Sequence, residues 1–263
     1  MFLGKVTIMD FDFSQVTKLS EHLYYSILFH EARYAPEQLL FHYTDAAAKS
    51  KIIDGNHITL KLSRVKDFED VEEGQHILKV YDAVYQEFSH QYSNRKFNAL
   101  MQSVKNNFLP HLEENINKYV FCFSKSENNE YLINHYAHRK NSQGYCIGFH
   151  ALKIEDIIEK CNGVHLVDVL YDSDNLAQSM KKVIYNAYRL REQDDEDFSI
   201  LKKILLHQLL IYSLCYKSSE FKEEEETRLI VARPQDPPPP FSVIQGSLFL
   251  ELDESAHYNS REV

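Results

Sequence analysis

The stretch Lys118-Tyr119-Val120-Phe121-Cys122-Phe123-Ser124 decides the fold class of this chain. Its succession of aromatic and β-branched side chains is typical of a β-strand, so we expect a strand over 118–124. Similar apolar runs occur on both sides of it along the chain. They predict further strands at Leu39–Tyr43, His57–Leu62, Gly144–Phe149, Val164–Tyr171 and Arg228–Ala232, and a last strand or hairpin at Phe241–Glu251.

Helical periodicity fills the intervals between these strands. The predicted helices cover Ser14–Tyr34, Ala46–Ile53, Ile77–Asn107, Leu109–Asn117, Asn128–Ala137, Leu152–Cys161, Asp174–Leu190 and Asp197–Tyr216. Strands and helices alternate irregularly, without the regular spacing of a doubly wound fold. The pattern predicts an α+β fold, with a mixed, mostly antiparallel sheet, flanking helices and an additional N-terminal helix.

Length and composition fit one globular unit. The chain has 263 residues, of which 44% are apolar and 26% charged, close to the globular average, so a sizeable core can form. We expect an N-terminal helical extension over 1–37, a single α+β domain over 38–252 and a polar tail over 253–263.

Charge and missing motifs argue against several classes of protein. The formal net charge of -10 repels phosphate backbones, so a nucleic-acid partner is not expected. Glycine-rich phosphate-binding motifs do not occur. Ile204–Tyr216, the longest apolar stretch, is too short and polar to span a bilayer, and Met1–Phe13 lacks the pattern of a secretory signal. We therefore expect a cytoplasmic protein without a membrane partner, whose cysteines are unpaired.

Polar side chains gather where predicted strands end, which is where binding sites collect. His42 and Thr44 point to the same side of the first strand, and Ser124 ends the strand over 118–124. A histidine and a hydroxyl so placed can hydrogen-bond a sugar diol or an amide, although a structural histidine is the simpler interpretation. His135 and His138 have helical spacing for a metal, but no third ligand is near, so we expect no metal.

A run of glutamates leads into the apolar strand Leu229–Val231. It reads Glu223-Glu224-Glu225-Glu226-Thr227-Arg228, and such a run is usually a solvated surface. If the strand starts at Glu224, then Glu224, Glu226 and Arg228 lie on one face, because side chains alternate along a strand. The acidic segment Asp67–Glu73 is expected to be a loop, and it is a weaker candidate for a lid or a cation site.

Taken in order, these segments resemble the bacterial family called domain of unknown function 2971. The matching residues are His42-Tyr43-Thr44 for H-Y-T, Leu60–Ser63 with Asp70 and Glu73 for L-x-L-S … N-D-x-x-E, Cys122-Phe123-Ser124 for C-F-S, His135-Tyr136-Ala137 for W-x-H-Y-A, Gly144–Phe149 for G-x-C-I-x-F, and Lys217, Phe221, Glu224, Glu226 and Arg228 for K-x-x-x-W-x-x-E-x-E-x-R. The chain departs from the family at Glu69, where Asn is usual, and at Ile133 and Phe221, where Trp is usual.

The order H-Y-T, C-F-S and E-x-E is also similar to that of the ADP-ribosyltransferase superfamily, whose members bind NAD and end their signature in a catalytic glutamate. This resemblance implies that NAD is the substrate, that no metal is needed, and that the acceptor is an unknown protein or small molecule. Glu226 would stabilise the cationic ribose as the nicotinamide bond breaks, and Glu224 would orient the acceptor. The NAD-binding residues would be His42, Tyr43, Thr44, Ser63, Ser124, Tyr136 and Arg228.

Two other functions stay open. A non-catalytic ligand- or protein-binding domain could keep the same architecture, since no nucleophile is visible. A metal-dependent nuclease would use Asp70, Glu73, Glu224 and Glu226, which the acidic charge disfavours. The NAD-cleaving interpretation makes a geometric demand. It requires His42, Thr44, Ser124, Tyr136 and Glu226 to line one pocket. If Glu226 lies on the opposite face of the sheet from His42, the NAD-cleaving interpretation loses its support.

Overall fold

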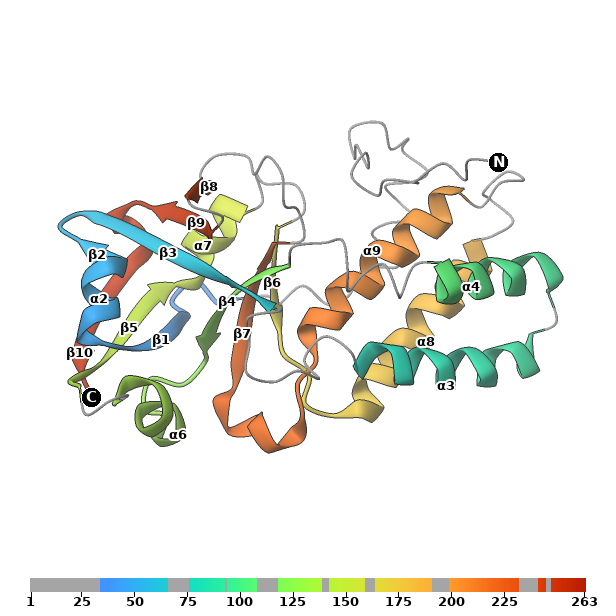
Figure 1. Ribbon diagram of the computed structural model, residues 1–263, viewed down its shortest axis with the longest axis horizontal. Coiled ribbons are helices and arrows are strands. Elements are labelled where there is room, and N and C mark those ends of the chain that lie inside the picture. Colours follow the sequence, from blue (N-terminus) through green and yellow to red (C-terminus); the bar gives the residue numbers. More distant parts are fainter. Residues whose placement is uncertain are drawn as a thin grey trace.

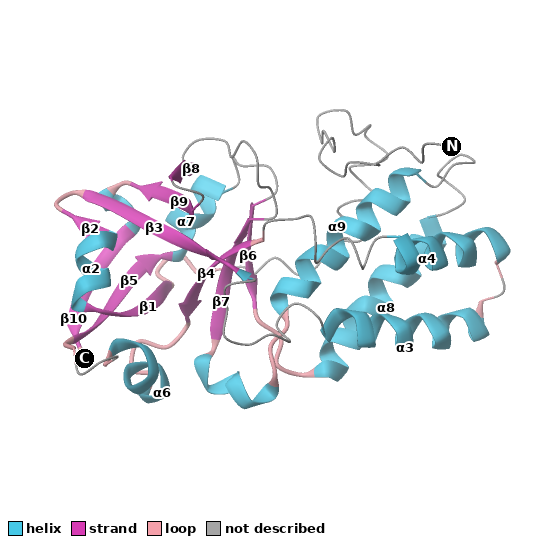
Figure 2. Cartoon of the chain, viewed as in Figure 1, coloured by secondary structure: helices cyan, strands magenta, loops and turns pink. Residues whose placement is uncertain are grey.

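A computed structural model describes residues 34–65, 76–92, 94–107, 118–138, 142–158, 164–190, 199–231, 241–244 and 247–263. Three predicted segments lie outside these residues: the helix over Ser14–Tyr34 apart from its last residue, the helix over Leu109–Asn117, and the acidic segment Asp67–Glu73. The fold is α+β, as the sequence predicts, and its sheet strands pair in antiparallel fashion (Figures 1 and 2).

The strands are β1 (Leu39–Asp45), β2 (Ile53–Asp54), β3 (His57–Arg64), β4 (Tyr119–Ser124), β5 (Gly144–His150), β6 (Val164–Asp168), β7 (Glu226–Val231), β8 (Phe241–Ile244), β9 (Ser247–Leu252) and β10 (His257–Glu262). The helices are α2 (Ala46–Ile52), α3 (His76–Gln91), α4 (Arg95–Asn107), α6 (Glu130–Leu132), α7 (Ala151–Ile158), α8 (Ser173–Leu190) and α9 (Ser199–Cys215), with the π-helix η4 (Ile133–Ala137) and the 3₁₀-helices η6 (Ser219–Glu224) and η7 (Glu254–Ala256).

Strand β4, the predicted strand 118–124, lies at a branch point of the sheet. Along one edge it pairs with β7 from Tyr119 to Ser124. Along its other edge it pairs first with β3, through Val120 and Tyr119, and then with β1, through Ser124 opposite Phe41. The sheet therefore divides along this edge of β4, and the polar end of β4 lies beside β1 and β7.

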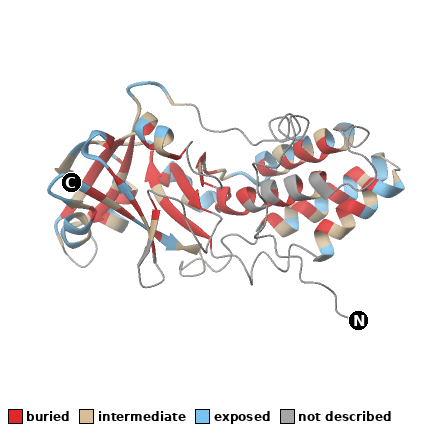
Figure 3. Cartoon of the chain, turned by 90° about the horizontal axis from the view of Figure 1, so that it is seen from above, coloured by how far each residue is buried: buried red, intermediate tan, exposed pale blue. Residues whose placement is uncertain are grey.

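Two pairs of helices are inserted between strands and form a helical lobe. Helices α3 and α4 come between β3 and β4, and α8 and α9 come between β6 and β7. They lie together at one end of the molecule, beyond β6 and β7 (Figure 1). Both this lobe and the sheet contain many buried residues (Figure 3), and their buried hydrophobic side chains form separate clusters.

The C-terminal residues correct one prediction. The segment 253–263 was expected to be a polar tail, but it contains η7 and the strand β10, which pairs with β5 from Phe149 to Tyr145. Its polar side chains are mostly exposed or half-buried, which suits an edge strand that faces water. The pairing satisfies the backbone groups of β5 and does not depend on an apolar pattern, so residues 253–263 carry no strand signal that a sequence pattern could reveal.

The described residues also bear on membrane-spanning helices and on disulfides. Among the described residues, no helix is long and apolar enough to cross a bilayer. Cys122, Cys146 and Cys215 form no disulfide in this part of the chain, and Cys161 lies outside it.

Candidate functional site

The pairing of β4 with β7 brings two predicted site residues face to face. Ser124 lies opposite Glu226, and Cys122 lies opposite Arg228. Residues directly opposite each other in an antiparallel pair project from the same face. Glu226 and Arg228 therefore share one face of the sheet with Ser124 and Cys122, and this face is covered near Arg228 by α9, whose Ile211, Leu214 and Cys215 pack against β7 and its neighbours.

Four charged side chains meet at the start of β7, and we call them the carboxylate cluster: Lys217, Glu224, Glu226 and Arg228. All four are buried. Nζ of Lys217 lies 2.5 Å from a carboxylate oxygen of Glu224 and 3.5 Å from Glu226. Arg228 reaches Glu226 through both Nε and Nη2, each at 2.8 Å. Two acids and two bases thus neutralise each other inside the protein, as buried charges must.

The backbone at Glu225 explains how two nearby glutamates reach the same place. Strand β7 begins at Glu226, and Glu224 is the last residue of η6. Between them Glu225 has a φ of 49°, in the left-handed region. The expectation that Glu224, Glu226 and Arg228 share one strand face is therefore wrong for Glu224. The turn at Glu225, and not the alternation of a strand, directs Glu224 towards the cluster.

The two carboxyl groups differ in acidity. Burial raises the pKa of Glu224 to about 7, and the neighbouring Glu226 adds to this, while Lys217 opposes it. Burial alone would also raise the pKa of Glu226, but Arg228 and Lys217 outweigh it and lower the pKa to about 2. Glu226 is therefore the more acidic of the two carboxyl groups, and Glu224 holds a proton more readily.

Two tyrosines border the cluster. The hydroxyl of Tyr136, on η4, donates to Glu224 at 3.2 Å. The hydroxyl of Tyr171 accepts a hydrogen bond from the backbone N–H of Glu226 at 2.8 Å. Burial raises the pKa of both tyrosines, so they stay protonated. Asn129, buried before α6, donates to the carbonyl of Glu223 and holds η6 against the α6–η4 segment.

The cluster also joins the sheet to the helical lobe. Nη1 of Arg228 donates to the carbonyl of Leu214, in the last turn of α9, at 2.9 Å. Lys217 lies two residues after the end of α9, and its backbone N–H donates to the carbonyl of Leu170. The last turn of α9 is thereby tied to β7 through the buried guanidinium of Arg228, and the segment after α9 through the ammonium group of Lys217.

His42 and Thr44 do not face the carboxylate cluster, which corrects a central expectation. Phe41 lies opposite Ser124, so Phe41 shares the face of Glu226, and alternation turns His42 and Thr44 to the other face. The imidazole of His42 packs on Phe121, with 4.4 Å between ring centroids, and its Nδ1 lies 3.0 Å from the carbonyl of Cys122. Burial lowers its pKa, so this histidine is neutral and bonded within the sheet. His42 and Glu226 therefore do not line one pocket, as an NAD site that uses both residues would require.

The remaining predicted residues fall at different places. Tyr43 lies on the cluster's face, but its hydroxyl donates to the carbonyl of Ser126 and accepts from the N–H of Asn129, so it anchors the turn before α6. Ser63 is exposed and pairs with Val120, at the opposite end of β4 from Ser124. The hydroxyl of Ser124 accepts from the N–H of Ser126. The structure thus brings Tyr136 together with Glu224, Glu226 and Arg228, and leaves His42, Thr44 and Ser63 apart.

Two residues of the site were not predicted as functional. Lys217 was recognised only as a motif residue, although it contacts both glutamates. Lys217 precedes Glu224 by seven residues and Glu226 by nine, and only the family motif marks this spacing as important. Tyr171 contributes through its hydroxyl to a backbone group, and no pattern in the sequence marks it.

No metal site is apparent in the part of the chain that the structure describes, where no three His, Cys, Asp or Glu side chains gather as ligands. His135 instead stacks on Tyr131, with 4.0 Å between ring centroids. Asp70 and Glu73, which the nuclease hypothesis requires, lie outside the described residues.

Comparison with known proteins finds a family match over part of the chain and no function. Residues 133–229 match the model of the family described as protein of unknown function (DUF2971), which confirms the family resemblance over that part of the chain. The matched range contains Tyr136 and the whole carboxylate cluster, whereas His42, Thr44, Ser63 and Ser124 precede it. No curated protein and no solved structure matches the chain.

Proposed function

We propose that this chain is a non-catalytic binding domain, in which the carboxylate cluster holds the helical lobe on the sheet. One observation carries the proposal. The carboxylate of Glu226 is buried, is bonded to Arg228 and Lys217, and lies on the face opposite His42 and Thr44. A carboxylate that stabilises a developing positive charge must reach the substrate, and one already paired with two cations has little charge left to offer.

A second candidate is an NAD-cleaving enzyme of the ADP-ribosyltransferase or NAD glycohydrolase kind. The observation that favours it is the difference in pKa between Glu224 and Glu226, because neighbouring carboxyls with separated pKa values often serve as acid and base. Tyr136, hydrogen-bonded to Glu224, would then border the reaction site. In this version His42 and Thr44 have no part in holding the ribose, so two of the expected NAD contacts are lost.

Nicotinamide release from labelled NAD decides between the two. The full chain is incubated with NAD alone and with a panel of lysate acceptors, and NAD binding is measured by calorimetry. The binding-domain proposal expects no release above that of a heat-denatured sample. Release that disappears in Glu226→Gln, while this variant stays folded and His42→Ala remains active, would overturn the proposal in favour of the second candidate.

The stability of Glu226→Gln gives an independent readout. If the cluster holds the lobes together, this variant unfolds more easily than wild type. If Glu226 is a reaction centre, the variant also loses turnover under conditions in which it is still folded. The exposed Glu223 on η6 supplies the matched control, because Glu223→Gln removes the same charge outside the cluster.

A further inference from the structure

A hollow lies between two helices of the helical lobe, away from the carboxylate cluster. It has a volume of about 170 Å³ and is lined by Val84, Glu87, Phe88, Gln91, Tyr92, Lys181 and Tyr185. The first four belong to α3, Tyr92 directly follows the last residue of α3, and the last two belong to α8. Residues three, four and seven apart lie on one side of a helix, so α3 presents a continuous wall to the hollow.

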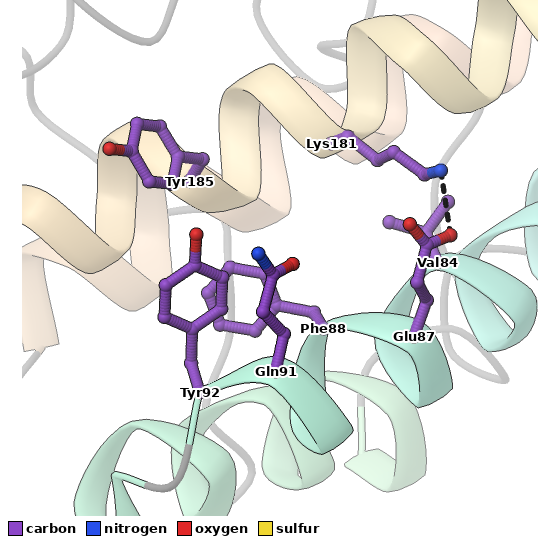
Figure 4. A pocket seen from close by; sticks show the side chains of 7 residues that line it. All are labelled: Val84, Glu87, Phe88, Gln91, Tyr92, Lys181 and Tyr185. Atoms are coloured by element: carbon purple, nitrogen blue, oxygen red, sulfur yellow. Dashed lines mark ion pairs between the residues drawn. The ribbon is translucent and has the colours of Figure 1, made fainter.

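The two ends of this hollow differ in chemistry, as Figure 4 shows. At one end the rings of Phe88, Tyr92 and Tyr185 lie close together, with centroids 4.5 Å apart for the first two and 6.1 Å apart for the two tyrosines. At the other end Lys181 pairs with Glu87 at 2.6 Å. The amide of Gln91 projects between the two ends (Figure 4).

The ion pair at the charged end is open to exchange. The side chain of Glu87 is 60% exposed and that of Lys181 36%. Exposed pairs of this kind contribute little to stability, so a ligand with charged groups of its own can separate Glu87 from Lys181. A ligand that brings both an ammonium and a carboxylate group leaves neither Glu87 nor Lys181 without a partner.

We propose that this hollow binds a small zwitterion with one aromatic ring, of the kind that a free aromatic amino acid represents. Its ring packs against Phe88, Tyr92 and Tyr185, its ammonium group faces Glu87, and its carboxylate faces Lys181. Aromatic rings prefer offset or edge-on contacts at centroid distances of about 4.5–7 Å, which the three side chains already show among themselves. Small-molecule sites typically combine such apolar walls with a few polar groups that fix the orientation.

The inference rests on the proposed function only in treating the chain as a binding domain. It concerns a different part of the molecule, so its failure leaves the role of the carboxylate cluster untouched. Conversely, NAD turnover would overturn the proposed function without affecting the hollow between α3 and α8.

The test uses the full chain and L-phenylalanine, with binding followed by calorimetry. Three related probes each lack one feature: 3-phenylpropionate has no ammonium group, 2-phenylethylamine no carboxylate, and L-leucine no ring. We expect saturable binding of L-phenylalanine. Loss of either charge should weaken binding about two- to fivefold, the worth of one exposed ion pair. Loss of the ring should weaken it further.

Variants locate the site. Tyr185→Ala should weaken binding about three- to tenfold, since it removes one aromatic contact. Lys181→Gln should weaken L-phenylalanine binding but not that of 2-phenylethylamine. Tyr258→Ala is the control, because this tyrosine is 60% exposed and lies on β10. Absence of saturable binding to folded wild-type protein would overturn the proposal, as would binding that Tyr185→Ala and Lys181→Gln change no more than Tyr258→Ala does.

Discussion

Glu226 and Arg228 lie two residues apart on β7, and the carboxylate of the first accepts a hydrogen bond from Nε of the second at 2.8 Å. Both side chains are buried, and Arg228 is 1% exposed. The same guanidinium donates to the carbonyl of Leu214 in α9. An ion pair within one strand therefore also connects that strand to a helix of the other lobe, and this connection underlies the predictions for Glu226 and Arg228.

Glu226→Gln is expected to destabilise the protein strongly. The change leaves Arg228 buried without its anionic partner, and breaking one side of a buried pair costs about 3–5 kcal/mol. Urea unfolding followed by circular dichroism measures the effect, with Glu223→Gln as the control that should change stability by less than about 0.5 kcal/mol. Equal stability of the two variants would contradict the structural role of the cluster.

Arg228→Met alone should lower the free energy of unfolding about as much as Glu226→Gln does. Combined with Glu226→Met, it should lower it much less. Replacing both members of a buried pair by apolar groups removes the unpaired charge, and such replacements are often neutral. A double-mutant cycle from urea unfolding gives the coupling energy, which should exceed about 1 kcal/mol. Additive effects would show that the two side chains act independently.

The pH dependence of stability should reveal Glu224. Its pKa is about 7 in the folded protein, against 4.5 for an unperturbed glutamate, so the folded state holds an extra proton between these values. The contribution of Glu224 to the free energy of unfolding is therefore fully present below pH 4.5 and is lost as the pH rises towards 7. Glu224→Gln, which carries no titrating proton, should flatten the fall in stability between pH 5 and 7. An unchanged slope in this variant would assign the effect to another group.

Glu226 acts in the opposite direction at lower pH. Its pKa is lowered to about 2, so the stability that it contributes is present above pH 4.5 and is lost as the pH falls towards 2. Unfolding curves of wild type and Glu226→Gln should therefore approach each other as the pH decreases over this range. A difference that stays constant down to pH 2 would contradict this assignment.

Removal of the C-terminal strand should also destabilise the protein. A chain that ends at Ala256 lacks β10, which leaves one edge of β5 without its pairing partner. We expect a loss of at least about 2 kcal/mol and a greater tendency to aggregate, measured by thermal unfolding and light scattering. Tyr258→Ala, which removes an exposed side chain but keeps the strand, should have little effect. Full stability of the truncated chain would restore the interpretation of 253–263 as a tail.

The sequence by itself determined the fold class and most element positions. Runs such as Tyr119–Ser124 and Gly144–His150 are rich in apolar and aromatic side chains, which favour strands, and the helices carry regular apolar spacing. The family motifs also selected Tyr136, Glu224, Glu226 and Arg228, which the structure brings together. Local preference suffices for such predictions because it acts over a few neighbouring residues.

Only the tertiary structure decided which face each polar residue occupies. The register of β1 against β4, with Phe41 opposite Ser124, turns His42 away from Glu226, and a shift of one residue would have reversed this outcome. The left-handed backbone at Glu225 brings Glu224 to the cluster from outside the strand. Register and chain reversal depend on the packing of distant segments, such as α9 on β7 and β10 on β5, and a pattern of neighbouring residues does not contain that information.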